Sequence, residues 1–177
     1  MRQLPPTFGA EVADRDALAA AVGLAPGDLH PSLPAQLVST GAAPLLLPAR
    51  DPGAIGRARP IPSALQALLE SVGTDGLYLF AATGASDVGG SAKARFFAAS
   101  SVIDEDAATG SAAGPCGAYL AERGAMQPGR LTITQGVEMG RPSTLLVDVE
   151  RGSDGSWVVH VSGGVARVAS GEFDLPL

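Results

Sequence analysis

The residues with the most evident chemical potential are the three acids at positions 104–106, followed by the turn Thr109-Gly110-Ser111. A run of small and apolar residues comes next and ends at a glycine, which is typical of a buried helix. Thr109 or Ser111 can cap the free amides of its first turn, and Gly110 lets a ligand approach the backbone. Because a helix start carries partial positive charge and unpaired N–H groups, it can hold a carboxylate or phosphate without Arg or Lys. The preceding acids can supply or accept a proton.

The same pattern has a plainer interpretation. An acid followed by Thr-Gly-Ser is also an ordinary way to begin a helix, and spacing alone does not separate the two. The two histidines, His30 and His160, lie far apart in the sequence and give no metal-ligand spacing. For His160 the alternative to a base is a half-buried position on a strand, and His30 is expected in a loop.

Helices and strands must place this turn, and the sequence indicates where they lie. Apolar spacing and acidic or proline starts predict helices over residues 14–23 and 61–73, with a helical turn opening at Asp51. Alternating or continuous apolar runs predict strands over residues 36–41, 44–48, 77–80, 93–97, 131–134, 145–149, 157–161 and 163–168. The run 44–48 does not alternate, which favours burial on both faces. The C-terminal half therefore reads as a meander of antiparallel strands after one central helix.

Two further segments are expected to be irregular. Prolines make residues 2–9 an extended segment that cannot lie inside a helix. Glycine and serine make residues 85–91 a flexible loop at the rim of the sheet.

Composition bounds the function. The chain has 177 residues, 46% of them hydrophobic, which is enough to bury a sizeable core. Its net charge of −6, with only 12 scattered Lys and Arg residues, argues against a nucleic-acid or acidic-membrane partner. The single cysteine, Cys116, excludes an internal disulfide. No apolar run approaches the ~20 residues that span a bilayer, and the cytoplasm is the expected location.

The stretch from residue 104 to 113 resembles the Glu-Asp-Pro-x-Thr-Gly-Ser-Ala signature of the PhzF-like phenazine biosynthesis family, whose members are relatives of diaminopimelate epimerase. Three further landmarks occur in the order of that family. They are Arg95-Phe96-Phe97, the segment from Gln135 to Ser143, and Gly163-Gly164-Val165-Ala166. The resemblance therefore covers most of the chain.

The resemblance implies an α+β fold, in which two similar lobes each curl a mostly antiparallel sheet around a central helix. The active site is then expected in the cleft between the lobes, at the start of the second central helix. Asp106 matches the catalytic aspartate of the signature, while Thr109, Gly110 and Ser111 match the turn that binds the substrate carboxylate. Neither a metal nor an organic cofactor is expected.

Two departures from the family pattern bear on the site. Ala107 replaces the usual proline, and Pro115 interrupts the expected helix, so that the helix should start late or kink. The superfamily's diaminopimelate epimerase has a catalytic thiol near this helix start, but Cys116 falls about a turn and a half into the helix and is better explained as a small buried side chain.

The first lobe of the family, which carries the catalytic glutamate, has no counterpart here. Residues 1–12 resemble an extended fringe of the first lobe, and residues 13–177 resemble the second lobe. We therefore expect an isomerase or epimerase-type protein that moves a proton on a small carboxylated substrate, incomplete until a second copy or a separate first-lobe chain supplies the missing acid. The alternatives are a non-catalytic carboxylate-binding domain and a self-associating domain. Exposure of the face that would meet a first lobe predicts a homodimer.

Overall fold

The computed structural model describes residues 1–86, 89–99 and 104–172. In these residues a single sheet runs in the order β1-β2-β3-β4-β5-β7-β8-β9, and β6 pairs with β5. The strands are β1 (Thr7–Val12), β2 (Ala35–Ser39), β3 (Leu45–Pro48), β4 (Gly76–Ser86), β5 (Gly89–Ala98), β6 (Glu105–Asp106), β7 (Gly129–Gln135), β8 (Ser143–Arg151) and β9 (Trp157–Gly163). The helices are α1 (Arg15–Ala21), α2 (Pro52–Arg57), α3 (Pro62–Val72) and α4 (Gly110–Glu122), with the 3-10 turn η1 at Pro26–Asp28.

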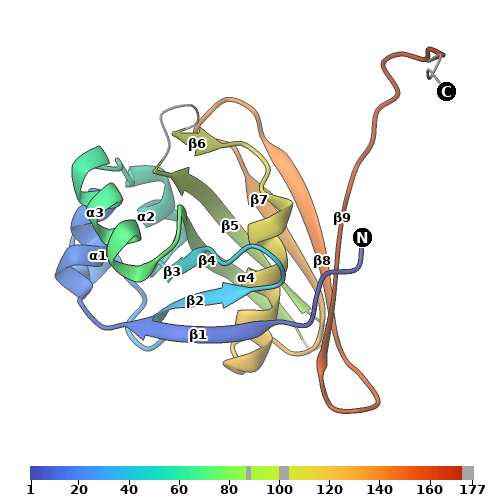
Figure 1. The fold of residues 1–177 in the computed structure, drawn as a ribbon, viewed down its shortest axis with the longest axis horizontal. Coiled ribbons are helices and arrows are strands. Elements are labelled where there is room, and N and C mark those ends of the chain that lie inside the picture. The colour runs from blue at the N-terminus through green and yellow to red at the C-terminus, as the bar shows by residue number, and fades with distance from the viewer. Residues whose placement is uncertain (87–88, 100–103, 173–177) are drawn as a thin grey trace, which may run out of the picture.

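The sheet curls around α4, while α1, α2 and α3 lie together on its other face (Figure 1). Pairing is antiparallel except between β3 and β4 and between β5 and β7. The fold is thus α+β, with a mostly antiparallel curled sheet around a central helix, as the sequence predicted.

Two hydrophobic cores form because the central strands are buried on both faces. On β4, Tyr78 and Phe80 point to the core around α4, whereas Leu77 and Leu79 point to the core beneath α1 to α3. Strand β3 divides in the same way, and all four of its residues are buried. This explains why the run 44–48 is continuously apolar.

The first residues of the chain join the two ends of the sheet. The Gln3 N–H donates to the Val159 carbonyl on β9, and the Leu4 N–H donates to the Thr40 carbonyl directly after β2. Figure 1 shows this N-terminal segment beside β9. Residues 1–12 are extended, as expected, and they belong to the same sheet as the rest of the chain. The division into a fringe and a lobe stays a prediction.

Small residues let α4 lie inside the curled sheet. A Cβ on Gly117 would come within 2.7 Å of Val147 Cγ1, so that only glycine fits this close approach. Helix α4 begins at Gly110 although Pro115 lies inside it, so the helix does not start late. Proline removes the N–H that would bond to the Ser111 carbonyl, and Ser111 is exposed, where water can replace that partner.

Two expectations about local structure were wrong. Residues 85–91 are largely strand, because β5 pairs with β4 on one side and β7 on the other; residues 87 and 88 lie outside the described residues. The last strand does not run from Gly163 to Val168 but ends at Gly163, and residues 164–172 have no strand structure. Among the described residues, no helix has the length and apolarity needed to cross a membrane.

Candidate functional site

The amino end of α4 lies closer to the surface than the rest of the helix. Residues 112–121 are buried, whereas Gly110 is partly exposed and Ser111 is exposed. Ala112 and Ala113 both donate their N–H groups to the Thr109 carbonyl. Gly110 and Ser111 precede them, in the part of the first turn where an α-helix supplies no acceptor for an N–H. Their amides are therefore the ones placed to meet an anion.

An open cavity of about 600 Å³ adjoins this helix start. Its lining includes Ala108 and Gly110 from the helix start, Ser143 and Thr144 from β8, and Ser162 and Gly163 from β9. The polar groups in this set are hydroxyls and backbone amides, which are neutral. Asp106 is not among the lining residues.

Asp106 is held within the loop that leads to α4. Its Oδ2 atom accepts a hydrogen bond from the Thr109 hydroxyl at 2.8 Å, and its Oδ1 atom lies 3.4 Å from the Ala108 N–H. Strand β6 supplies the backbone support, since Asp106 pairs with Phe96 of β5. Thr109 occupies the N-cap position, but its side chain makes no capping bond to the helix, which corrects the expectation that Thr109 or Ser111 caps it. Its hydroxyl is used on Asp106 instead.

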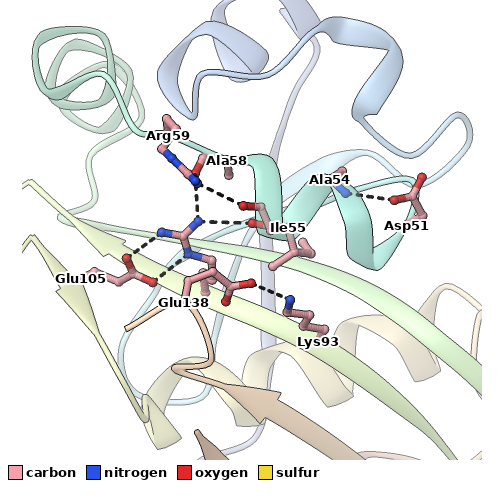
Figure 2. A network of polar contacts seen from close by, with 10 residues as sticks. Asp51, Ala54, Ile55, Ala58, Arg59, Lys93, Glu105 and Glu138 are labelled. Carbon is pink, nitrogen blue, oxygen red and sulfur yellow. Dashed lines mark hydrogen bonds and ion pairs between the residues drawn. The ribbon is translucent and has the colours of Figure 1, made fainter. Parts of the chain in front are cut away.

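Glu105 is occupied by a different partner. Arg95, only 5% exposed, donates from Nε and Nη2 to the two carboxylate oxygens of Glu105, each at 2.7 Å. Its Nη1 donates to the carbonyls of Ile55 and Ala58 at the end of α2, at 3.2 and 2.9 Å. Figure 2 shows Glu105 held in this network. Of the three acids before the helix, Glu105 is therefore structural, Asp104 is exposed, and Asp106 contacts the helix start.

Glu138, in the landmark from Gln135 to Ser143, forms an ion pair with Lys93 at 2.5 Å (Figure 2). Burial raises the pKa of Glu138, but the hydrogen bond and charge of Lys93 outweigh burial and hold it below the usual value. Arg141, in the same landmark, has an exposed side chain.

The other candidate nucleophile and bases do not join the site. Cys116 is fully buried in the core around α4, and burial raises the pKa of its thiol far above the usual range, so it is a small core side chain. His160 lies half-buried on β9 opposite Asp148. His30 lies in the loop after η1, where its Nδ1 accepts from the N–H groups of Ser32 and Leu33. Within the described ranges, no three His, Cys, Asp or Glu side chains gather as a metal site would require.

Gln135, at the end of β7, is the residue of this site that sequence reasoning missed. It is fully buried, and its Nε2 group donates to the Asp106 carbonyl at 2.8 Å and to the Thr109 hydroxyl at 2.9 Å. Its Oε1 atom accepts from the Tyr78 hydroxyl at 3.0 Å and from the Thr109 N–H at 3.3 Å. The signal available in the sequence was its place at the start of the landmark from Gln135 to Ser143.

Gly136 brings the two landmarks into contact. Its φ is +79°, and a Cβ there would lie 2.7 Å from the Ala107 carbonyl oxygen and 2.4 Å from that of Arg141. A side chain at position 136 would therefore push the β7 end away from the loop that carries Asp106.

Comparison with known proteins gives a match to one family model and to relatives that are named as isomerases. The family model described as phenazine biosynthesis-like protein matches residues 1–171. The chain is 44% identical over 72 residues to trans-2,3-dihydro-3-hydroxyanthranilate isomerase of Pseudomonas chlororaphis. This aligned region covers 40% of this chain and 26% of that enzyme. It is 32% identical over 150 residues to the uncharacterized isomerase YddE of Salmonella typhimurium, covering 82% of this chain and 48% of the relative. The chain thus spans at most about half the length of these two relatives.

Solved structures agree on the fold. A predicted epimerase from Pseudomonas aeruginosa superposes with a TM-score of 0.69 at 35% identity, over 97% of this chain and 58% of that one. A PhzF-family protein from Bacillus anthracis superposes with a TM-score of 0.79 at 24% identity, over 92% of this chain and 56% of that one. The second likeness concerns the fold alone.

Proposed function

Because the chain belongs to the phenazine biosynthesis-like protein family, we propose that it acts as an isomerase or epimerase-type protein, moving a proton on a small carboxylated substrate. The observation that carries the proposal is the position of Asp106. The Thr109 hydroxyl holds its carboxylate directly before the free amides of α4, and Gly110 at this helix start lines an open cavity of about 600 Å³. A fixed carboxylate next to an anion holder is the pairing that such a proton transfer needs.

In this proposal each group has one task. The N–H groups of Gly110 and Ser111 hold the substrate carboxylate, helped by the partial positive charge at the helix start. Thr109 orients Asp106, which exchanges a proton with the substrate. No charged side chain of the cavity lining competes for the substrate carboxylate, since Ser143, Thr144 and Ser162 are neutral. Neither metal nor organic cofactor takes part.

The substrate class follows from the holder and from the relatives. A small molecule with one carboxylate fits the helix amides, and the matched Pseudomonas chlororaphis enzyme is named for such a carboxylate, trans-2,3-dihydro-3-hydroxyanthranilate. This compound is therefore the first probe to use.

Inversion at a carbon centre needs a second acid that returns the proton from the opposite face, and we propose that this acid comes from outside this stretch of chain. Glu105, the nearest carboxylate in sequence, is engaged with buried Arg95 and is not available. The family resemblance assigns the role to a glutamate on a first lobe. We propose that a second copy of the chain, or a first lobe outside this stretch, supplies the corresponding group. Val165 and Val168, which are 97% and 93% exposed on the segment after β9, are the side chains through which we propose that a second copy associates.

The test is solvent-deuterium exchange into trans-2,3-dihydro-3-hydroxyanthranilate, together with NMR titration of the Gly110 and Ser111 amides. We expect both amides to shift on titration, and any exchange to be abolished by Asp106→Asn. Asp104→Asn is the matched control, because it removes one negative charge from an exposed position two residues away. The exchange by monomeric chain should be weak or absent. Exchange that survives Asp106→Asn would contradict the proposal.

A non-catalytic carboxylate-binding domain is the second candidate. The observation in its favour is that Asp106 is the one acid of the 104–106 stretch that contacts the helix start, while inversion of a carbon centre by proton transfer needs two groups. Amide shifts without exchange, in every oligomeric state that the protein forms, would select this candidate.

A further inference from the structure

We infer that Gln135 is a positioning residue, which directs the hydroxyl hydrogen of Thr109 onto Asp106 and so fixes the orientation of that carboxylate. The inference rests on the proposed role of Asp106. Its basis is a buried hydrogen-bond chain that runs from Tyr78 through Gln135 and Thr109 to Asp106. Gln135 comes from β7, 26 residues beyond Thr109, so the loop is oriented by a distant part of the chain.

The orientation of the Gln135 amide is determined by two backbone groups that cannot change their chemistry. The Thr109 N–H can only donate, and it faces Oε1 at 3.3 Å. The Asp106 carbonyl can only accept, and it faces Nε2 at 2.8 Å. Rotating the amide by half a turn would place Nε2 against the Thr109 N–H, so that two donors would face each other. It would also place Oε1 against the Asp106 carbonyl, so that two acceptors would face each other. A buried amide does not tolerate such mismatches, so the observed orientation is the stable one.

The fixed amide then decides what the Thr109 hydroxyl does. The second Nε2 hydrogen of Gln135 points to Thr109 Oγ1 at 2.9 Å, so the hydroxyl oxygen is the acceptor in that bond. A threonine hydroxyl has one hydrogen. With its oxygen accepting from Gln135, this hydrogen is donated to Asp106 Oδ2, 2.8 Å away. All four hydrogen-bonding positions of the Gln135 side chain are thereby used.

Tyr78 completes the chain from the core. Its side chain is fully buried, and burial is the main cause that raises the pKa of the phenol well above its usual value. The phenol therefore keeps its hydrogen and donates to Gln135 Oε1 at 3.0 Å. The donor and the acceptor of each bond in this hydrogen-bond chain are thus assigned, and each donor group is buried or partly buried.

The consequence for Asp106 is a carboxylate oriented before substrate binds. Rotation about its side-chain bond would break the short contact with Thr109, whereas Oδ1 has only the 3.4 Å contact with the Ala108 N–H. Groups held in place in advance need no reorganisation during proton transfer, which is the usual benefit of such support. Gln135 contributes to this without touching the substrate.

The test is NMR of the full chain labelled with ¹³C and ¹⁵N. We expect a slowly exchanging Thr109 hydroxyl hydrogen with a through-bond coupling to the Asp106 carboxyl carbon, and a coupling from Gln135 Nε2 to the Asp106 carbonyl carbon. A hydroxyl hydrogen coupled to the Gln135 side-chain carbonyl instead would overturn the inference. This measurement needs no variant, so it decides even where a variant fails to fold.

Two variants sharpen the result. Gln135→Glu removes both side-chain N–H donors at nearly unchanged shape, and the coupling between the Thr109 hydroxyl and Asp106 should be lost. Thr109→Ser keeps the hydroxyl and should retain the coupling. Persistence of the coupling in Gln135→Glu would show that Gln135 does not direct it. A different result would contradict the proposed function. In that case the Gly110 and Ser111 amides would not respond to trans-2,3-dihydro-3-hydroxyanthranilate, although the couplings are intact.

Discussion

Gln135 and Thr109 are joined by two hydrogen bonds of opposite direction: Nε2 donates to Oγ1 at 2.9 Å, and the Thr109 N–H donates to Oε1 at 3.3 Å. This reciprocal pair connects the end of β7 to the start of α4. It brings together two landmarks that lie well apart in the sequence. The stability of that junction, and of the core that surrounds α4, leads to the following predictions.

Gly136→Ala should destabilise the protein and disturb the loop that carries Asp106. The new Cβ would meet carbonyl oxygens of Ala107 and Arg141 at 2.7 and 2.4 Å, in addition to the strain of a positive φ. We expect a loss of about 2 kcal/mol or more in the free energy of unfolding by urea. Gly140→Ala is the control, because it has a positive φ of 67° and no atom within 4 Å of the new Cβ. Equal losses in the two variants would show that the contact with the loop is unimportant.

Gly117→Ala should be destabilising although alanine is the better helix former. The added methyl group would lie 2.7 Å from Val147 Cγ1 and 3.0 Å from Val149 Cγ2. Overpacking of this kind costs about 1–3 kcal/mol, which exceeds the gain of about 1 kcal/mol in helix propensity. Thermal unfolding measures the difference. Gly56→Ala on α2, where the nearest atom is 3.5 Å away, should instead be neutral or stabilising.

Arg95→Met should cost about 3 kcal/mol or more, measured by chemical denaturation, because it leaves Glu105 without its partner in a largely buried site. The side chains of this pair are only 6% and 17% exposed. Arg130→Met is the matched control, since Arg130 makes a similar two-bond pair with Asp148 at the surface, where such pairs contribute little. Similar losses in both variants would contradict the burial argument.

Lys93→Met should make the free energy of unfolding depend less steeply on pH in the acidic range. The folded-state pKa of Glu138 lies below its usual value of 4.5, so the pair with Lys93 stabilises the protein above that pH and is lost as the pH falls through the folded pKa. The measurement is the free energy of unfolding between about pH 6 and about pH 3. Lys93→Arg keeps the charge and should retain the steeper dependence of the unfolding free energy on pH. An unchanged dependence in Lys93→Met would show that the pair of Lys93 with Glu138 does not cause it.

The native mass of the protein should correspond to a dimer of the 17.7 kDa chain. The exposed segment after β9 carries Val165 and Val168, and replacing both with serine should raise the dimer dissociation constant, as measured by analytical ultracentrifugation over a range of concentrations. A monomer at every concentration would move the search for the second acid to a first lobe outside this stretch of chain. A dimer unaffected by the serine variant would place the interface elsewhere.

The sequence by itself determined the local elements and the place of the candidate site. Asp14 and Asp51 accept from the amides of Ala17 and Ala54 at the starts of α1 and α2, as their positions before apolar or proline-led runs indicated. The amphipathic spacing of 61–73 became α3. These signals are local, because caps and periodicity depend on neighbours within one or two turns. The start of the central helix after Asp106 was predictable for the same reason.

Only the tertiary structure decided which groups meet. Residues 85–91 read as a loop by composition, yet pairing with strands on both sides makes most of them strand. Thr109 reads as a helix cap, yet Gln135 turns its hydroxyl to Asp106. Glu105 and Asp106 are neighbours in sequence with opposite fates, since one meets buried Arg95 and the other meets Thr109. Each outcome depends on contacts between residues distant in sequence, and local patterns carry no information about which distant donor or strand will be the partner.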